Sequence, residues 1–110
     1  MFIVDRCALI GMVHTLPLPG SPNGSVEMAT ILNRARTDAE ALVRGGCDAI
    51  IIENMGDLPY LNGQVHPETV AAMAVICHEL RNLDCPIGLQ ILAGANEQAL
   101  AVAAVTTVQF

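Results

Sequence analysis

Apolar residues in this chain cluster into short runs with the character of β-strands. Three such runs are CALIGMV at 7–13, DAIIIEN at 48–54 and CPIGLQIL at 85–92, and a fourth begins with VQF at 108–110. Unbroken runs rich in β-branched residues are typical of strands buried on both faces, as in a parallel sheet covered by helices. The runs therefore predict the strands of a parallel sheet.

Between the runs, apolar residues recur every three or four positions, as on one face of a helix. The first helix is expected to begin behind Ser25, a suitable N-cap, and to end at Gly45 and Gly46. Within it, Arg36 and Glu40 are spaced to pair across one turn. Its inward residues are predicted to be Met28, Ile31, Leu32, Ala35, Ala39, Leu42 and Val43.

Two further helices are expected. The second opens at Pro67, a residue suited to the first helical position. Its buried stripe is predicted to be Val70, Met73, Ala74, Cys77 and Leu80. The third is expected to start after Asn96, with Leu100, Ala103 and Ala104 inward.

Strand and helix alternate three times at a spacing of roughly 40 residues, the size of a βα unit with short loops. Consecutive parallel strands require crossover connections, so this order predicts an α/β fold. It is compatible with an open doubly wound sheet and with part of a barrel. Neither G-x-G-x-x-G nor a P-loop follows the first strand, which disfavours a nucleotide-binding version.

The composition excludes two classes of partner. The 110 residues carry a net charge of −6, and five basic residues are dispersed along the chain, which leaves no basic patch for nucleic acid or an anionic membrane surface. The chain is 53% hydrophobic and only 15% charged, so an unusually large share of it is suited to burial. A small molecule, another protein or a second copy remains as the partner.

No segment has the pattern of a membrane span or a targeting signal. The stretch MFIVDRCALIGMV is interrupted early by Asp5 and Arg6, and no apolar run approaches the ~20 residues of a span. The four cysteines show no C-x-x-C spacing and are expected to be reduced and structural. These features predict a soluble cytoplasmic protein, and an organellar location stays open.

Candidate chemistry lies where the strand runs end, because parallel α/β folds form their ligand sites at the carboxyl ends of the strands. The polar residues at these ends are His14, Glu53, Asn54, Asp57, Gln90 and Asn96. His14 and Glu53 are the candidates for catalysis, and the other four are candidates for contacts to substrate. A divalent metal stays open as a cofactor, with Glu53 and Asp57 as its ligands.

Each of the main candidates also has a structural interpretation. His14 fits a general acid or base, but equally a residue that orders the loop after it. Glu53 fits a catalytic base, or a carboxylate paired with a polar group of a neighbouring strand. Asp57 lies in the sequence NMGDLP, where a turn-shaping role is favoured, and Asn54 has the same two interpretations.

Four stretches together resemble the BtpA family, which is similar to the bacterial SgcQ proteins and is named for a cyanobacterial factor needed for photosystem I accumulation. They are IGMVHTLPLPGSP at 10–22, GGCDAIIIENMGDLPY at 45–60, VHPETVAAM at 65–73 and CPIGLQIL at 85–92. The resemblance implies a TIM (β/α)8 barrel of the phosphate-binding type. His14, Glu53, Asn54 and Asp57 match the strand-end motifs of the family, whose members are described both as assembly factors and as enzymes.

The resemblance also implies that residues 1–110 form a single truncated barrel fragment of about three and a half βα units, with little activity of its own. In phosphate-binding barrels the phosphate site comes from the loops after strands seven and eight. Bacterial relatives tend to carry an Arg-Asn-Asp-like group after the third strand, where this chain has AGAN at 93–96. The complete form is expected to be an enzyme for a phosphorylated or sugar-like molecule, or alternatively a non-enzymatic assembly factor.

Overall fold

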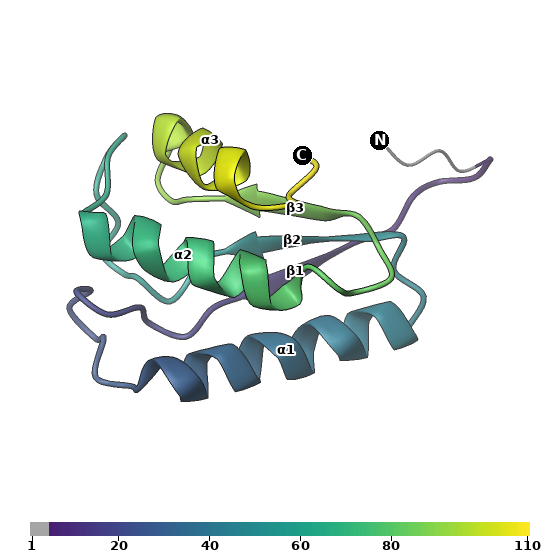
Figure 1. Cartoon of the computed structure of the whole chain (residues 1–110), viewed down its shortest axis with the longest axis horizontal. Helices are drawn as coiled ribbons and strands as arrows, with labels where there is room; N and C mark the ends of the chain where they lie inside the picture. The colour runs from purple at the N-terminus through teal and green to yellow at the C-terminus, as the bar shows by residue number, and fades with distance from the viewer. Residues whose placement is uncertain (1–4) are drawn as a thin grey trace.

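The computed structural model describes residues 5–110 and shows strands and helices in strict alternation. The strands are β1 (Ile10–His14), β2 (Ala49–Glu53) and β3 (Ile87–Gln90), and the helices are α1 (Met28–Arg44), α2 (Pro67–Leu80) and α3 (Asn96–Val105). The strands pair in parallel in the order β1-β2-β3. Figure 1 shows α1, α2 and α3 following one another around the sheet. The expected α/β fold with parallel βα repeats is confirmed.

Side chains of the sheet alternate between a helix-covered face and an open face. In β1 the exposed residues alternate with buried ones, so that Val13 is buried while Met12 is 38% exposed. Ile50 and Ile52 of β2 are fully buried in the same core as Val13. Ile51, which pairs with Met12, is only partly buried. One face of the sheet therefore carries the core, and the other carries Met12 and Ile51 as the inner face of a barrel would.

Helices α1 and α2 cover the sheet with their predicted apolar faces, with one adjustment in α2. In α1, Ile31, Ala35 and Ala39 are buried as expected. The buried residues of α2 are Thr69, Ala72, Met73, Ile76, Cys77 and Leu80. Val70 and Ala74 pack only at the edge of this core, so the stripe is centred slightly to one side of the predicted one. Burial also raises the pKa of the Cys77 thiol to about 12.

The prediction for α3 was wrong about its inward face. Val102 is the buried residue of this helix, whereas Leu100 is 70% exposed and Ala104 is also exposed. Nearly every position of the helix is apolar, so periodicity gives little contrast between one face and another. Packing against α2 and β3 decides the orientation instead.

Two local predictions for α1 were also wrong. The N-cap residue is Glu27 rather than Ser25, and no side-chain hydrogen bond caps the helix. Arg36 pairs with Glu79 of α2 at 2.8 Å instead of with Glu40. The end of the helix is as expected, because Gly45 follows Arg44 and its N–H donates to Ala41 O at 2.9 Å.

The run at 108–110 adds backbone hydrogen bonds to the edge of β3. Gln109 N–H donates to Ile87 O at 2.8 Å, and Leu89 N–H donates to Phe110 O at 2.9 Å. The Phe110 ring lies over Gly88, where an added Cβ would come within 2.6 Å of it. The segment thus lies beside β3 where a fourth strand is expected, although its pairing is not that of a regular strand.

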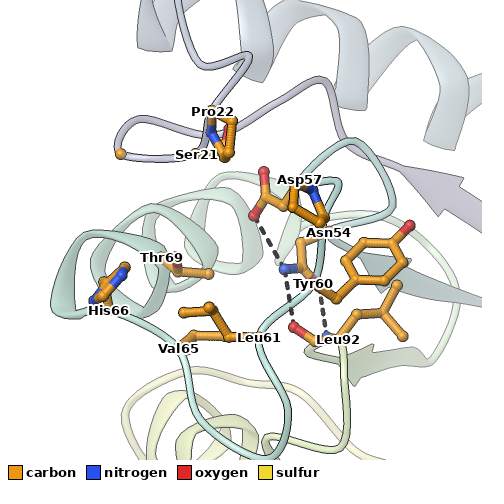
Figure 2. A pocket seen from close by; sticks show the side chains of 12 residues that line it. Ser21, Pro22, Asn54, Asp57, Tyr60, Leu61, Val65, His66, Thr69 and Leu92 are labelled. Carbon is orange, nitrogen blue, oxygen red and sulfur yellow. Dashed lines mark hydrogen bonds between the residues drawn. The ribbon is translucent and has the colours of Figure 1, made fainter.

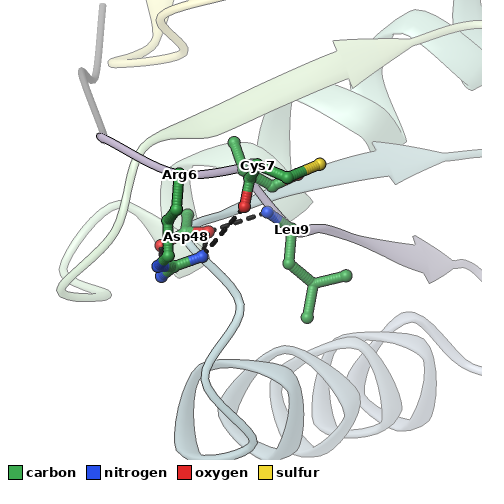
Figure 3. A network of polar contacts seen from close by, with 5 residues as sticks. Arg6, Cys7, Leu9 and Asp48 are labelled. Carbon is green, nitrogen blue, oxygen red and sulfur yellow. Dashed lines mark hydrogen bonds and ion pairs between the residues drawn. The ribbon is translucent and has the colours of Figure 1, made fainter.

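The amino end of the sheet is held by a polar cluster of Arg6, Leu9 and Asp48 (Figure 3). Leu9 N–H donates to Asp48 Oδ2 at 2.7 Å, and the Arg6 guanidinium donates to both carboxylate oxygens, at 2.9 and 2.5 Å. The Leu9 N–H and then Arg6 hold the pKa of the Asp48 carboxyl below its usual value. The cluster fixes the chain just ahead of β1 to the start of β2. Residues 1–4, the first part of the segment considered for a targeting signal, lie outside the described residues.

Across residues 5–110 no helix is both long and apolar enough to cross a membrane.

Candidate functional site

The carboxyl edge of the sheet carries a row of three polar residues, each the last residue of its strand. His14 of β1 pairs in register with Glu53 of β2, and Glu53 pairs with Gln90 of β3. Paired residues of a parallel sheet project to the same face, here the open face that also carries Met12 and Ile51. The structure therefore brings together three of the six predicted site residues.

The pair of His14 and Glu53 combines a buried carboxylate with an accessible imidazole. His14 Nε2 lies 3.3 Å from Glu53 Oε2, and the exposed fraction of the side chain is 47% for His14 but only 7% for Glu53. Gln90 is exposed at the end of the row. A carboxylate, an imidazole and an amide on one open edge can accept and donate hydrogen bonds and can exchange a proton with a bound molecule.

Asn54 points away from this row and joins two loops. Its Oδ1 accepts the Leu92 N–H at 2.7 Å, and its Nδ2 lies 3.5 Å from Leu92 O. The same Nδ2 donates to Asp57 Oδ2 at 3.0 Å. The Asn54 amide is thus engaged with the loop after β3 and with its own loop, as its structural interpretation expected.

Asp57 makes the corresponding link to the loop after β1. Its Oδ1 accepts the Leu18 N–H at 2.7 Å, and its own N–H donates to Asn54 O at 3.1 Å in the turn. Both carboxylate oxygens therefore accept a hydrogen bond from the protein. These contacts support the turn-shaping interpretation of Asp57, and its role toward a substrate stays a prediction.

Close backbone approaches complete the connections between the three loops. Leu61 and Gly63 of the β2–α2 loop exchange hydrogen bonds with Ala93 of the β3–α3 loop, at 3.1 and 2.8 Å. On the other side, a Cβ added at Gly56 would lie 2.6 Å from Pro17 N and 2.7 Å from Thr15 O. A side chain at position 56 would push the first two loops apart, which explains the glycine of NMGDLP.

Asn96 lies apart from the row. It is the exposed first residue of α3, and its backbone N–H donates to Gly94 O at 2.9 Å. A contact between Asn96 and a substrate stays a prediction. For a metal ion, residues 5–110 contain no group of three or more His, Cys, Asp or Glu side chains placed to bind one. Each Asp57 oxygen already accepts one hydrogen bond from the protein, and a role of Glu53 or Asp57 as a metal ligand stays a prediction.

A pocket of about 190 Å³ lies beside the row, between the first two loops and the start of α2 (Figure 2). It contains none of His14, Glu53 and Gln90. Its lining residues are Gly20, Ser21, Pro22, Asn54, Asp57, Pro59, Tyr60, Leu61, Val65, His66, Thr69 and Leu92. Of these, Asn54 and Asp57 are among the site residues predicted from the sequence. Pro67 marks the helix start nearby, but no sequence pattern shows that residues 20–22 fold over it.

Comparison with known proteins identifies both family and fold. The model of the BtpA family matches residues 5–110. The chain is 40% identical over 112 residues to an uncharacterized mitochondrial protein of Caenorhabditis elegans and covers 40% of its length. It is 43% identical to an uncharacterized protein of Archaeoglobus fulgidus, 93% of this chain aligning with 41% of that one.

A third relative has a functional name. The chain is 39% identical to the photosystem I biogenesis protein BtpA of Synechocystis, with 93% of this chain covering 36% of that protein. The chain therefore spans about two fifths of the length of the relatives that it matches.

Among solved structures, the 7,8-dihydropteroate synthase of Vibrio fischeri superposes with a TM-score of 0.63 at 23% identity, over 92% of this chain and 36% of that one. This likeness shows the fold alone. Together with the parallel βα repeats, it shows that the chain folds as part of a TIM barrel.

Proposed function

Because the chain belongs to the BtpA family, we propose that the row of His14, Glu53 and Gln90 forms part of the active site of a barrel enzyme for a sugar-like or phosphorylated small molecule. The observation that carries the proposal is the pair at the strand ends, in which His14 Nε2 lies 3.3 Å from a nearly buried Glu53 carboxylate. Barrel enzymes place their catalytic groups at this end of the strands.

Within the row, Glu53 is the proton-transferring group and His14 is its partner. The contact at 3.3 Å orients the imidazole, and the exposed part of His14 leaves room for a second proton transfer to a bound molecule. Gln90, with an amide that both donates and accepts, suits the hydroxyl groups of a sugar-like molecule. A phosphate group would be bound by the loops after strands seven and eight, as in other phosphate-binding barrels.

The proposal is tested first by binding. The thermal unfolding of the chain is measured with a panel of sugars and sugar phosphates, for the wild type, Glu53→Gln and His14→Gln. One ligand is expected to raise the Tm of the wild type and to lose this effect in both variants. Glu79→Gln, which removes an exposed carboxylate of α2, serves as the matched control and should keep the shift. An equal shift in all four proteins would refute the assignment.

A second candidate function is assembly or stabilisation of another protein. The Synechocystis relative is a photosystem I biogenesis protein by name, and the outer face of α3 carries Leu100 and Val105 at 70% and 73% exposure. A contiguous exposed apolar patch marks an interaction surface, and in this second proposal Leu100 and Val105 belong to such a patch. In this case Leu100→Ser with Val105→Ser would abolish complementation of a strain lacking the family protein, whereas Glu53→Gln would not. The opposite pattern favours the enzyme.

A further inference from the structure

The pocket beside the row is separate from the proposed active site and has its own polar group. Figure 2 shows the Asp57 side chain directed into the space between the segment of Ser21 and Pro22 and the start of α2. Asp57 is 8% exposed, and each of its carboxylate oxygens accepts one hydrogen bond from the protein. A carboxylate oxygen can accept two, so one further acceptor position remains on each.

The rest of the pocket combines apolar walls with the hydroxyl-bearing residues Ser21, Tyr60 and Thr69 and with His66. Pro22, Pro59, Leu61 and Val65 supply aliphatic surface. The Tyr60 ring lines the pocket while its hydroxyl donates outward to Met55 O at 2.7 Å. The buried Ser21 Oγ has no hydrogen-bond partner within residues 5–110. A ligand here meets hydrocarbon on most sides and a carboxylate at one end.

The volume limits the size of the ligand. An apolar cavity of about 150 Å³ holds one benzene molecule, and drug-sized pockets begin at about 300 Å³. The observed 190 Å³ therefore suits a single ring or a short branched chain with one small polar group. Because the carboxylate at the end can accept but not donate, that polar group is a donor.

From these observations we propose that the pocket binds a small primary ammonium compound with an apolar body, its ammonium group donating to Asp57. This proposal does not rest on the proposed catalysis, because the row takes no part in the pocket. The loops that form the walls are already joined through Asn54, Asp57 and Ala93. The pocket is thus formed before a ligand enters, which lowers the cost of binding.

The test uses three probes of the same shape and different charge: benzylamine, benzyl alcohol and benzoate. Each is titrated into the ¹⁵N-labelled chain, and amide chemical shifts are followed by NMR. Benzylamine is expected to shift the amides of the pocket residues and to bind about tenfold or more tightly than benzyl alcohol, because a hydrogen bond to a charged group is stronger than a neutral one. Benzoate is expected not to bind.

Matched variants separate this pocket from general attraction of a cation to an acidic protein. Val65→Phe fills the pocket and should abolish binding, whereas Val75→Phe, on the exposed outer side of α2, should leave it unchanged. Both variants keep the net charge of the chain. Equal binding of the three probes, or retained binding of benzylamine in Val65→Phe, would overturn the proposal. Loss of sugar binding in Glu53→Gln would not affect this result.

Discussion

His14 and Glu53 lie directly opposite each other in the parallel register of β1 and β2, with His14 Nε2 3.3 Å from Glu53 Oε2. The backbone fixes this relationship, because Thr15 N–H donates to Glu53 O at 2.9 Å just beyond the pair. The two side chains therefore meet as a consequence of strand register rather than of a flexible loop. A one-residue slip of that register would place them on opposite faces.

Asn54 is expected to be a major source of stability for the loops. Asn54→Ala leaves the Leu92 N–H and one Asp57 oxygen without their partner, so the free energy of unfolding should fall by about 2–3 kcal/mol. Urea unfolding followed by circular dichroism measures this change. Asn82→Ala, at an exposed position after α2, is the control and should stay within about 0.5 kcal/mol of the wild type. Equal losses in both variants would contradict the assigned role.

Gly56→Ala should lower stability through a steric clash. The new Cβ would lie 2.6 Å from Pro17 N and 2.7 Å from Thr15 O, and these backbone atoms cannot move without displacing the end of β1. Overpacking of this kind typically costs about 1–3 kcal/mol. Leu58→Ala in the same loop removes a side chain that is 54% exposed and should cost less. If denaturation midpoints show Gly56→Ala to be as stable as the wild type, the two loops do not approach this closely.

Asp48 should make the fold sensitive to acid. Its folded pKa is lowered by the Leu9 N–H and by Arg6, so the unfolded chain binds the proton more readily than the folded chain does. The stabilisation is complete above the unfolded pKa of about 3.9 and is lost as the pH falls through the lower folded pKa. Urea midpoints between pH 2 and 6 should fall less steeply toward low pH in Asp48→Asn than in the wild type. Parallel curves would show that the cluster contributes nothing to acid stability.

The cysteines should differ strongly in reactivity. Cys77 is buried and its thiol pKa is raised to about 12, so almost no thiolate forms at pH 8. Cys7 is exposed. Iodoacetamide labelling of the native chain, followed by peptide mass spectrometry, should modify Cys7 well before Cys77. In urea both cysteines should be labelled at one rate. The same equal rates in the native chain would indicate that the α2 core opens readily.

Much of the architecture was predictable because its signals are local. The isoleucine run of β2 and the glycines after α1 mark their elements directly, and parallel order places the residues at the strand ends on one edge. This reasoning correctly brought His14, Glu53 and Gln90 to the carboxyl edge. Their catalytic or binding roles remain predictions, because position on an edge does not determine chemistry.

The contacts that hold the loops together were not predictable. Asn54 accepts a hydrogen bond from the backbone N–H of Leu92, 38 positions away, and Asp57 accepts one from that of Leu18, 39 positions away. Every residue except proline carries a backbone N–H, so the sequence does not show which one a side chain will bind. The pocket was missed for the same reason. For α3, an almost uniformly apolar helix carries no pattern to orient it, and Leu100 was assigned to the wrong face.

The joined loops have a consequence for the thermodynamics of recognition at this edge. Glu53 is followed immediately by Asn54, whose amide is held by Asp57 and by the loop after β3. This part of the edge is ordered before any ligand arrives. Binding of a ligand there should therefore release water without the entropy cost of ordering chain segments. A calorimetric heat-capacity change on binding should therefore reflect only the surface that the ligand itself covers, far below the value for a segment that folds as it binds.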